Sequence, residues 1–157
     1  MGERERDPFD QKVVEVARVT RVVAGGKRMR FRALVVIGDH KGKVGMGLRK
    51  GMDVQEAVNK AITAAKKNII TVPIHNESIP HQISIKFKSS KLLLKPAKPG
   101  SGIKAGGSVR SVMDLAGVKN VSGKMLGSSN NTNNVYAVFQ AFRKLKSAEQ
   151  IKATRKQ

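Results

Sequence analysis

Positive charge dominates this sequence and limits the ways in which the chain can become compact. Thirty-one Lys and Arg residues face 11 Asp and Glu residues in 157 positions, a formal net charge of +20, and four of the acids lie in the first ten residues. So large an excess repels itself in a folded state unless an anionic partner neutralises it. A polyphosphate is the natural partner, because each neutralised phosphate releases a condensed counterion. The alternative is a solvated basic surface, but about 2–8 charges already suffice for the solubility of a small domain.

The rest of the composition fits a folded chain without disulfides. A hydrophobic share of 39% allows small cores, and the length fits one compact domain or two small ones. The absence of cysteine excludes disulfides and thiolate metal sites and fits a reducing compartment. No apolar run approaches the roughly 20 residues that span a bilayer. The charged start of the chain, MGERERDPFD, matches neither a signal peptide nor a myristoylation site.

The first half of the chain predicts an antiparallel meander followed by a helix. Apolar and charged residues alternate, with the period of a strand, over 12–24, 29–37 and 43–48. The runs AGGKR (24–28) and GDHKG (38–42) supply the two turns. Asp53 is the expected N-cap of the helix, with Glu56 three residues on as in a capping box. The apolar stripe of this helix is mostly alanine, so the helix can lie close to the sheet.

The second half predicts a further α+β module. Strands are expected at 70–75, 82–88, 91–97 and 118–124, and helices at 108–116 and along the apolar face from Val135 to Leu145. A glycine-rich loop precedes the first of these helices, and Gly117 is its expected C-terminal cap. We therefore divide the chain into a disordered tail (1–10), an N-terminal RNA-binding module (11–69), a C-terminal module (70–146) and a basic, frayed tail (147–157).

No arrangement of residues predicts catalysis, a metal site or a cofactor. His75 and His81 stand six apart across a proline with Glu77 as the one nearby acid, and His40 lies in a turn, whereas a metal site needs more ligands. The loop GSGIKAGG has neither the spacing of the dinucleotide fingerprint nor the GK[ST] ending of a phosphate-binding loop. We interpret it either as a close backbone contact with RNA or a protein neighbour, ahead of a helix N-terminus that favours phosphate, or as a plain strand-to-helix connection.

Basic residues concentrate on the predicted meander and its helix. Arginine suits bidentate contact with phosphate, and phosphate contacts position a protein without reading base sequence. The chain has five Phe, one Tyr and no Trp, which argues against recognition of single strands by base stacking. We therefore expect recognition of the shape and backbone of folded RNA. The predicted RNA-binding residues are Arg18, Arg21, Gly25, Gly26, Lys27, Arg28, Arg30, Arg32, Lys41, Lys43, Arg49, Lys50, Lys66 and Lys67.

Several runs of the sequence, taken together and in order, resemble one family. The run VTRVVAGGKRMRFRALVVIGDHKGKVGMGLRKGMDVQEAVNKAITAAKKN resembles the N-terminal module of bacterial small-subunit ribosomal protein number five. The runs IPH, LLLKPAKPGSGIKAGGSVRSVMDLAGVKNVSGK and LGSSNNTNNV resemble its C-terminal module, and the likeness covers residues 12–146. It implies an α+β fold with an N-terminal β-β-β-α module of the double-stranded-RNA-binding type. A C-terminal β-α-β-α module of the type of that family's second domain would follow.

The resemblance also implies a structural role, without enzymatic activity, in the cytoplasmic ribosome. The partners would be small-subunit rRNA and small-subunit ribosomal proteins four and eight, with one copy per subunit. The chain would lie between head and body on the mRNA entry side and support decoding fidelity and translocation. The turn 24–28 matches the family's loop near the spectinomycin site and the hinge of the head. Gly102 and Arg110 match the region that faces protein four, and Lys104 joins them as an expected protein contact.

Two other functions stay open at this point. A free-standing double-stranded-RNA-binding protein would need only the basic meander and its helix, and the second module argues against it. An enzyme of nucleotide metabolism on a fold related to the second module would need an acid pair, which the chain does not offer.

Overall fold

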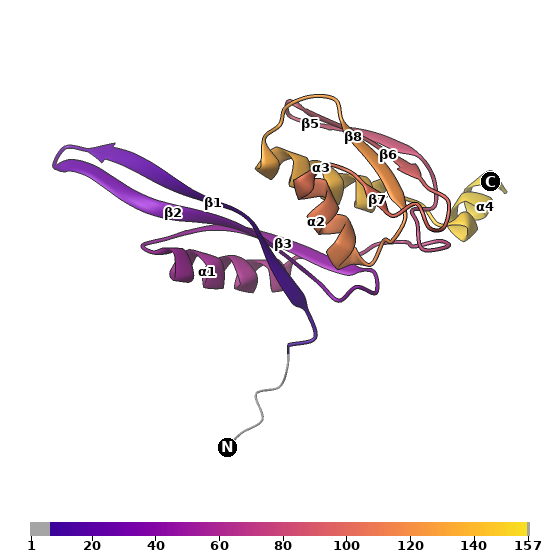
Figure 1. The fold of residues 1–157 in the computed structure, drawn as a ribbon, viewed down its shortest axis with the longest axis horizontal. Helices are drawn as coiled ribbons and strands as arrows, with labels where there is room; N and C mark the ends of the chain where they lie inside the picture. The colour runs from indigo at the N-terminus through magenta and orange to yellow at the C-terminus, as the bar shows by residue number, and fades with distance from the viewer. Residues whose placement is uncertain (1–6, 157) are drawn as a thin grey trace, which may run out of the picture.

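The computed structural model describes residues 7–156 and has two sheets with helices packed between and beside them (Figure 1). The first sheet consists, in order, of β1 (Asp10–Val23), β2 (Gly26–Gly38), β3 (Lys43–Gly51) and β4 (Ile69–Thr71). The second consists of β5 (Ile83–Phe87), β6 (Ser90–Pro96), β8 (Val121–Met125) and β7 (Ile103–Lys104). The helices are α1 (Val54–Lys67), α2 (Gly107–Ala116), α3 (Asn131–Lys144) and α4 (Ala148–Arg155). The predicted α+β class, with β-β-β-α followed by β-α-β-α, is confirmed.

The central strand β2 is covered on both faces, which explains its unbroken apolar run from residue 33 to 37. Ala33, Val35 and Ile37 point to one face and pack against the alanines of α1. Leu34 and Val36 point to the other face and join a larger core that includes α2, α3 and the second sheet. A strand buried on both faces loses the alternation of a half-exposed strand. The two modules therefore share the larger core, while the first module has a second, smaller core between β2 and α1.

Helix α1 approaches β3 closely because both surfaces carry small residues. A Cβ atom added to Gly45 would lie 2.5 Å from the carbonyl oxygen of Ala65, and one added to Gly51 would lie 2.6 Å from the nitrogen of Ala57. A Cβ added to Gly47 would collide with the carbonyl of Ala61. The predicted cap holds this helix in place, since the Asp53 carboxylate accepts a hydrogen bond from the Glu56 backbone at 2.7 Å. The predicted close packing of helix and sheet is thus confirmed.

The β2–β3 turn docks on the C-terminal end of α2 and joins the modules. The backbone nitrogen of His40 donates to the carbonyl of Leu115 at 3.0 Å, and that of Gly42 donates to the carbonyl of Ala116 at 2.9 Å. The last carbonyls of a helix lack partners within the helix, so the turn supplies them from another module. Gly117 follows with a φ of 86°, the left-handed conformation expected at its cap position.

Three sequence-based expectations need correction. The strand predicted at 70–75 is β4, which spans only Ile69–Thr71 and pairs with β3 in the first sheet, so the boundary between 69 and 70 falls inside a strand. The tail predicted for 1–10 overlaps β1, which begins at Asp10, while residues 1–6 lie outside the described part. Within the tail predicted for 147–157, residues 148–155 form α4 behind the capping box of Ser147 and Gln150.

The glycine-rich loop also contains β7, a two-residue strand parallel to β8 that the sequence did not reveal. None of the helices in residues 7–156 is long and apolar enough to cross a membrane.

Candidate nucleic-acid interface

Strands β1 and β2 extend beyond the rest of the protein as a ribbon, which we call the hairpin arm (residues 17–32; Figure 1); at its base, Phe31 and Arg32 also pair with β3. Ala24 and Gly25 form the turn at its tip, and Gly26, the first residue of β2, has a φ of 129° that favours glycine. A Cβ at either glycine would have no atom within 4 Å, so the tip is open to a partner. The tip thus gives an anionic surface access to the backbone.

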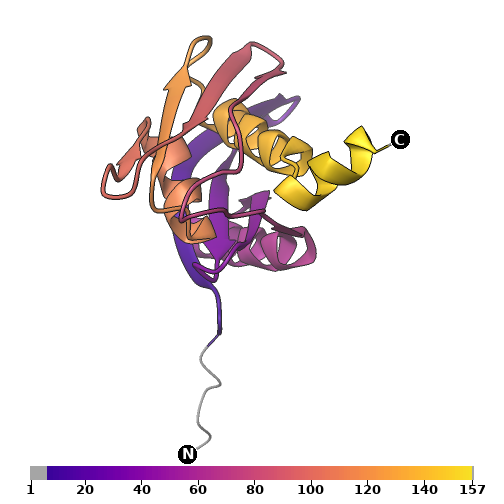
Figure 2. The same cartoon turned by 90° about the vertical axis from the view of Figure 1, so that its right-hand side faces the viewer.

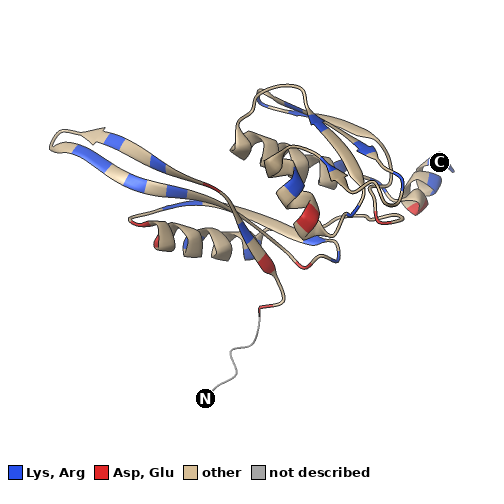
Figure 3. Cartoon of the chain, in the orientation of Figure 1, with Lys and Arg blue, Asp and Glu red and all other residues tan. Residues whose placement is uncertain are grey.

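Strand register sorts the basic residues of the arm onto two faces. Arg21 stands opposite Arg28, Val19 opposite Arg30 and Ala17 opposite Arg32, so these side chains share one face. We call it the arginine face; it consists of Arg21, Arg28, Arg30 and Arg32, and Lys50 of β3 stands opposite Arg32. The bands of basic residues along the arm are seen in Figure 3.

The arginine face carries a hollow with strong positive charge. A cavity of about 450 Å³ is lined by Arg21, Arg28, Arg30 and Lys50, together with valine and threonine of β1, and no acidic side chain lines it. The ion pairs found among residues 7–156 are His40–Asp10, Lys60–Glu56, Lys66–Asp7 and Lys119–Glu77. None of them includes a residue of the arginine face, so these cations form no ion pair among the described residues.

Two predicted arm residues, Arg18 and Lys27, lie on the opposite face. Arg18 stands opposite Phe31, and Lys27 stands opposite Val22. Val22 and Met29 on this face are exposed, at 75% and 51% of their surface. The structure therefore does not gather all predicted arm cations on one surface.

A second basic group lies beside α1. Arg49 lines a cavity of about 370 Å³ with Lys60 and Lys67, and we call these three residues the α1 basic group. Lys60 also pairs with Glu56 at 2.7 Å. Lys66, predicted to bind RNA, pairs with Asp7, and this hydrogen bond holds the pKa of the Asp7 carboxyl below its usual value. The RNA-binding residues predicted from the sequence did not include Lys60, because single lysines on an exposed helix face give no distinctive pattern.

Lys41 and Lys43 lie at the opposite end of β2 from the tip. Their backbone nitrogens donate to the Asp39 carboxylate at 2.8 and 3.1 Å, and these hydrogen bonds hold the β2–β3 turn together. Burial alone would raise the pKa of the Asp39 carboxyl, but the hydrogen bonds outweigh burial and lower it. Since this turn docks on α2, the two lysines belong to the junction of the modules and not to the arginine face.

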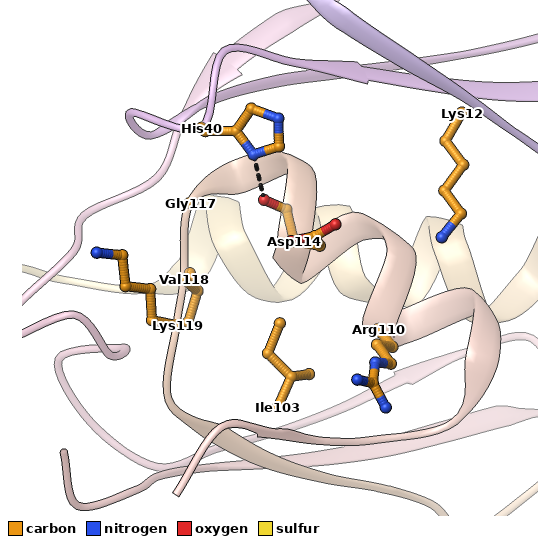
Figure 4. A pocket seen from close by; sticks show the side chains of 8 residues that line it. All are labelled: Lys12, His40, Ile103, Arg110, Asp114, Gly117, Val118 and Lys119. Atoms are coloured by element: carbon orange, nitrogen blue, oxygen red, sulfur yellow. Dashed lines mark hydrogen bonds between the residues drawn. The ribbon is translucent and has the colours of Figure 1, made fainter. Parts of the chain in front are cut away.

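A third basic group surrounds a cavity of about 390 Å³ at the same junction (Figure 4). Its charged lining consists of Lys12, Arg110 and Lys119, with Asp114 and His40 at one side; we call it the junction cavity. Of the predicted protein contacts, Arg110 lines this cavity directly. Gly102 and Lys104 flank its lining residue Ile103, and the Gly102 nitrogen donates to the Asn120 side chain at 3.1 Å. Lys12 and Lys119 were missed because they come from distant segments of the chain.

His40 bridges two segments at the edge of the junction cavity. Its Nδ1 lies 2.8 Å from the carbonyl oxygen of Asp114 and its Nε2 lies 2.7 Å from Oδ2 of Asp10. Both partners accept hydrogen bonds, so the imidazolium form, which donates from both nitrogens, fits best. The hydrogen bond to Asp10 is the main reason that the pKa of His40 rises above its ordinary value of 6.5.

His81 joins two segments that lie far apart in the sequence. His81 accepts a hydrogen bond from the Lys146 backbone at 3.1 Å through Nε2, and its Nδ1 lies 2.9 Å from the Gln82 carbonyl. Within residues 7–156, no group of three His, Asp or Glu side chains is placed to hold a metal ion.

Comparison with protein-family models finds two matches in the order of the two modules. The model of the ribosomal protein S5 N-terminal domain matches residues 9–73, and that of the C-terminal domain matches residues 85–155. Together they cover most of the chain, including the hairpin arm and the junction cavity. The chain belongs to the ribosomal protein S5 family, whose members are structural, rRNA-binding proteins of the small ribosomal subunit.

Proposed function

We propose that the hairpin arm binds small-subunit rRNA between the head and body of the subunit, and thereby supports decoding fidelity and translocation. The observation that carries this proposal is the arginine face, which holds four guanidinium groups on an extended ribbon with an open glycine tip. Guanidinium groups bind phosphate through two parallel hydrogen bonds. A narrow ribbon can enter a groove between RNA helices that a globular surface cannot reach.

The junction cavity is proposed as a contact with a neighbouring ribosomal protein. Lys12, Arg110 and Lys119 outnumber Asp114 there, so acidic side chains are its fitting partners. The family resemblance supports small-subunit proteins four and eight as neighbours and a position at the mRNA entry side. One copy per subunit, with both modules acting as a single rigid unit, completes the proposal.

Incorporation into ribosomal subunits tests the role of the arm. A double variant, Lys27→Ala with Arg28→Ala, removes one cation from each face of the arm close to its tip. A matched double variant, Lys152→Ala with Arg155→Ala, removes two cations from α4. We expect the first pair to reduce co-sedimentation with the small subunit or to change the response to spectinomycin, and the second pair to do neither. Equal, negligible effects of the two pairs would contradict the proposal.

Translation accuracy tests the junction cavity. Arg110→Glu reverses the charge of a cavity residue, whereas Lys98→Glu changes the charge of an exposed loop residue outside the cavity. We expect the first variant to alter stop-codon readthrough at normal subunit content, and the second to leave it unchanged. Unaltered readthrough in both would remove the cavity from the proposal.

The second candidate is a free-standing double-stranded-RNA-binding protein, favoured by the β-β-β-α arrangement of the first module alone. It would bind RNA duplexes of any origin equally well. Competition between small-subunit rRNA and an unrelated duplex distinguishes the two functions, because only the ribosomal function predicts a preference.

A further inference from the structure

A narrow hollow lies at the seam where the first sheet meets both α1 and α3. Strand β4 pairs with β3 only over Lys43 to Gly45, so the outer edge of β3 beyond Gly45 has no strand partner within residues 7–156. Helices α1 and α3 lie on opposite faces of the sheet next to this edge (Figure 2). The cavity between them has a volume of about 230 Å³, and we call it the seam hollow.

The seam hollow combines an apolar floor with a polar rim. Met46 and Phe139 are nearly fully buried, at 8% and 3% exposure, and form part of the floor together with Leu48 and Ala64. The rim carries two carboxamides and two guanidinium groups, from Asn68, Gln140, Arg49 and Arg143. No acidic side chain lines the hollow.

Several lining groups are held in position before any ligand arrives. The Tyr136 ring stacks on Phe87 with ring centroids 5.3 Å apart. The amide nitrogen of Asn68 donates to the Ala64 carbonyl at 3.3 Å, which leaves its amide oxygen available. The Arg49 guanidinium donates to the carbonyl of Leu48 at 2.9 Å. Groups fixed in this way lose less entropy when they bind a ligand.

The seam hollow continues into the cavity of the α1 basic group. Arg49 and Ala64 line both cavities, so the two are adjacent. The first offers apolar and carboxamide groups, and the second offers Lys60 and Lys67. A nucleotide has one part that suits each cavity. Its base is flat and partly apolar, with hydrogen-bonding edges, and its phosphate is anionic.

We propose that the seam hollow binds the base of one unpaired, extruded RNA nucleotide, with the flanking phosphates on the α1 basic group. This inference rests on the proposed function, since it takes the RNA partner from it and adds a second, base-contacting site away from the arm. The carboxamides of Asn68 and Gln140 contact the edges of the base, as such groups do in nucleic-acid recognition. The apolar floor covers part of its face.

An extended peptide fits the seam less well. Addition of a strand to β3 requires the free backbone groups of its edge, and the Leu48 carbonyl already accepts a hydrogen bond from the Arg49 side chain. A peptide of matching chemistry would also have to combine an acidic group with a flat polar one.

Binding of two RNA hairpins with the same stem tests the proposal. One hairpin is fully paired and the other carries a single bulged nucleotide. The full-length protein is expected to bind the bulged hairpin about tenfold more tightly than the paired one. Such a difference in affinity is usual when a protein contacts the edge and the face of a single base. Gln140→Ala and Asn68→Ala should abolish most of this preference and leave the affinity for the paired hairpin unchanged. Gln11→Ala, on an exposed position of β1 outside the hollow, is the matched control.

A photoreactive thio-substituted base at the bulge gives a second measurement. We expect crosslinks to peptides that contain residues of α3 between 136 and 143. Equal affinity for both hairpins, an unchanged preference in both variants, or crosslinks confined to the arm would overturn the proposal. Crosslinks in assembled subunits from these α3 residues to a neighbouring protein would overturn it as well.

The same data separate this inference from the proposed function. If the protein binds both hairpins equally and still enters the small subunit through its arm, only the seam proposal fails. If arm variants leave rRNA binding and incorporation unchanged, the proposed function fails independently of the bulge.

Discussion

Removing one arginine from the arm is expected to stabilise the free protein while it weakens RNA binding. Arg28 stands directly opposite Arg21 on the exposed ribbon, and Arg30 follows on the same face. Like charges that face each other across two strands are destabilising by roughly 0.2–1 kcal/mol. Arg28→Ala removes this repulsion, so the midpoint of thermal unfolding should rise by at most about 4 °C for a chain of this length.

The same substitution should weaken the complex with RNA. Loss of one phosphate contact lowers rRNA affinity and reduces the slope of its salt dependence by about 1. The gain in stability should itself shrink as salt rises, because exposed charges are screened over about 8 Å at 0.15 M ionic strength.

Calorimetry of the free protein and filter binding of rRNA at several salt concentrations provide the two measurements. Lys27→Ala is the control for stability, because Lys27 stands opposite the uncharged Val22 and its removal relieves no direct like-charge pair. A fall of the unfolding midpoint in Arg28→Ala, or an unchanged salt slope, would refute the assignment of the arginine face.

Three further substitutions test the packing of α1 on β3, the contact between His40 and Asp10, and the N-cap of α4. Gly47→Ala should destabilise the protein by about 1–3 kcal/mol in urea unfolding, because the new methyl group meets the Ala61 carbonyl; no loss would mean that α1 does not lie as close to β3. The pKa of His40 is raised in the folded state, so its contact with Asp10 contributes most below about pH 6.5 and is lost as pH rises through the folded pKa. Thermal unfolding at pH 6 and pH 8 should therefore differ less in Asp10→Asn than in the native protein, and an equal difference would exclude this contact as the cause. Ser147→Ala removes the N-cap of α4 and should speed amide exchange in 148–155 by about fivefold, the equivalent of about 1 kcal/mol, with the unfolding midpoint unchanged; a shifted midpoint would place α4 in the core.

Local chemistry made much of the fold predictable from the sequence. The cap at Asp53 and the left-handed Gly117 depend on a few neighbouring residues, and the structure confirms both. The sheet to which β4 belongs could not be predicted, because three residues with an exposed threonine carry no sign of their partner. Helix α4 was missed for a related reason, since it buries no residue and so has no apolar stripe.

The candidate site was predictable by composition but not by arrangement. The basic character of the meander indicated an RNA surface, yet the face of each cation follows from strand register. Arg18 and Arg21 are three residues apart on one strand and so point to opposite faces, which the period of a strand alone would have revealed. The junction cavity combines β1, the β2–β3 turn, β7 and α2 with the residues that follow it, and nothing in the local pattern of Lys12 or Lys119 indicates that they meet.

Strand β2 has a mechanical consequence for the two ends of the molecule. Its 13 residues begin at the tip of the arm and end at Gly38, beside the turn that caps α2. A strand of this length spans roughly 43 Å at about 3.3 Å per residue. Because residues 33–37 are packed on both faces, the C-terminal half of β2 is fixed in the core, and the arm projects from it as a continuation of the same strand, without a flexible linker.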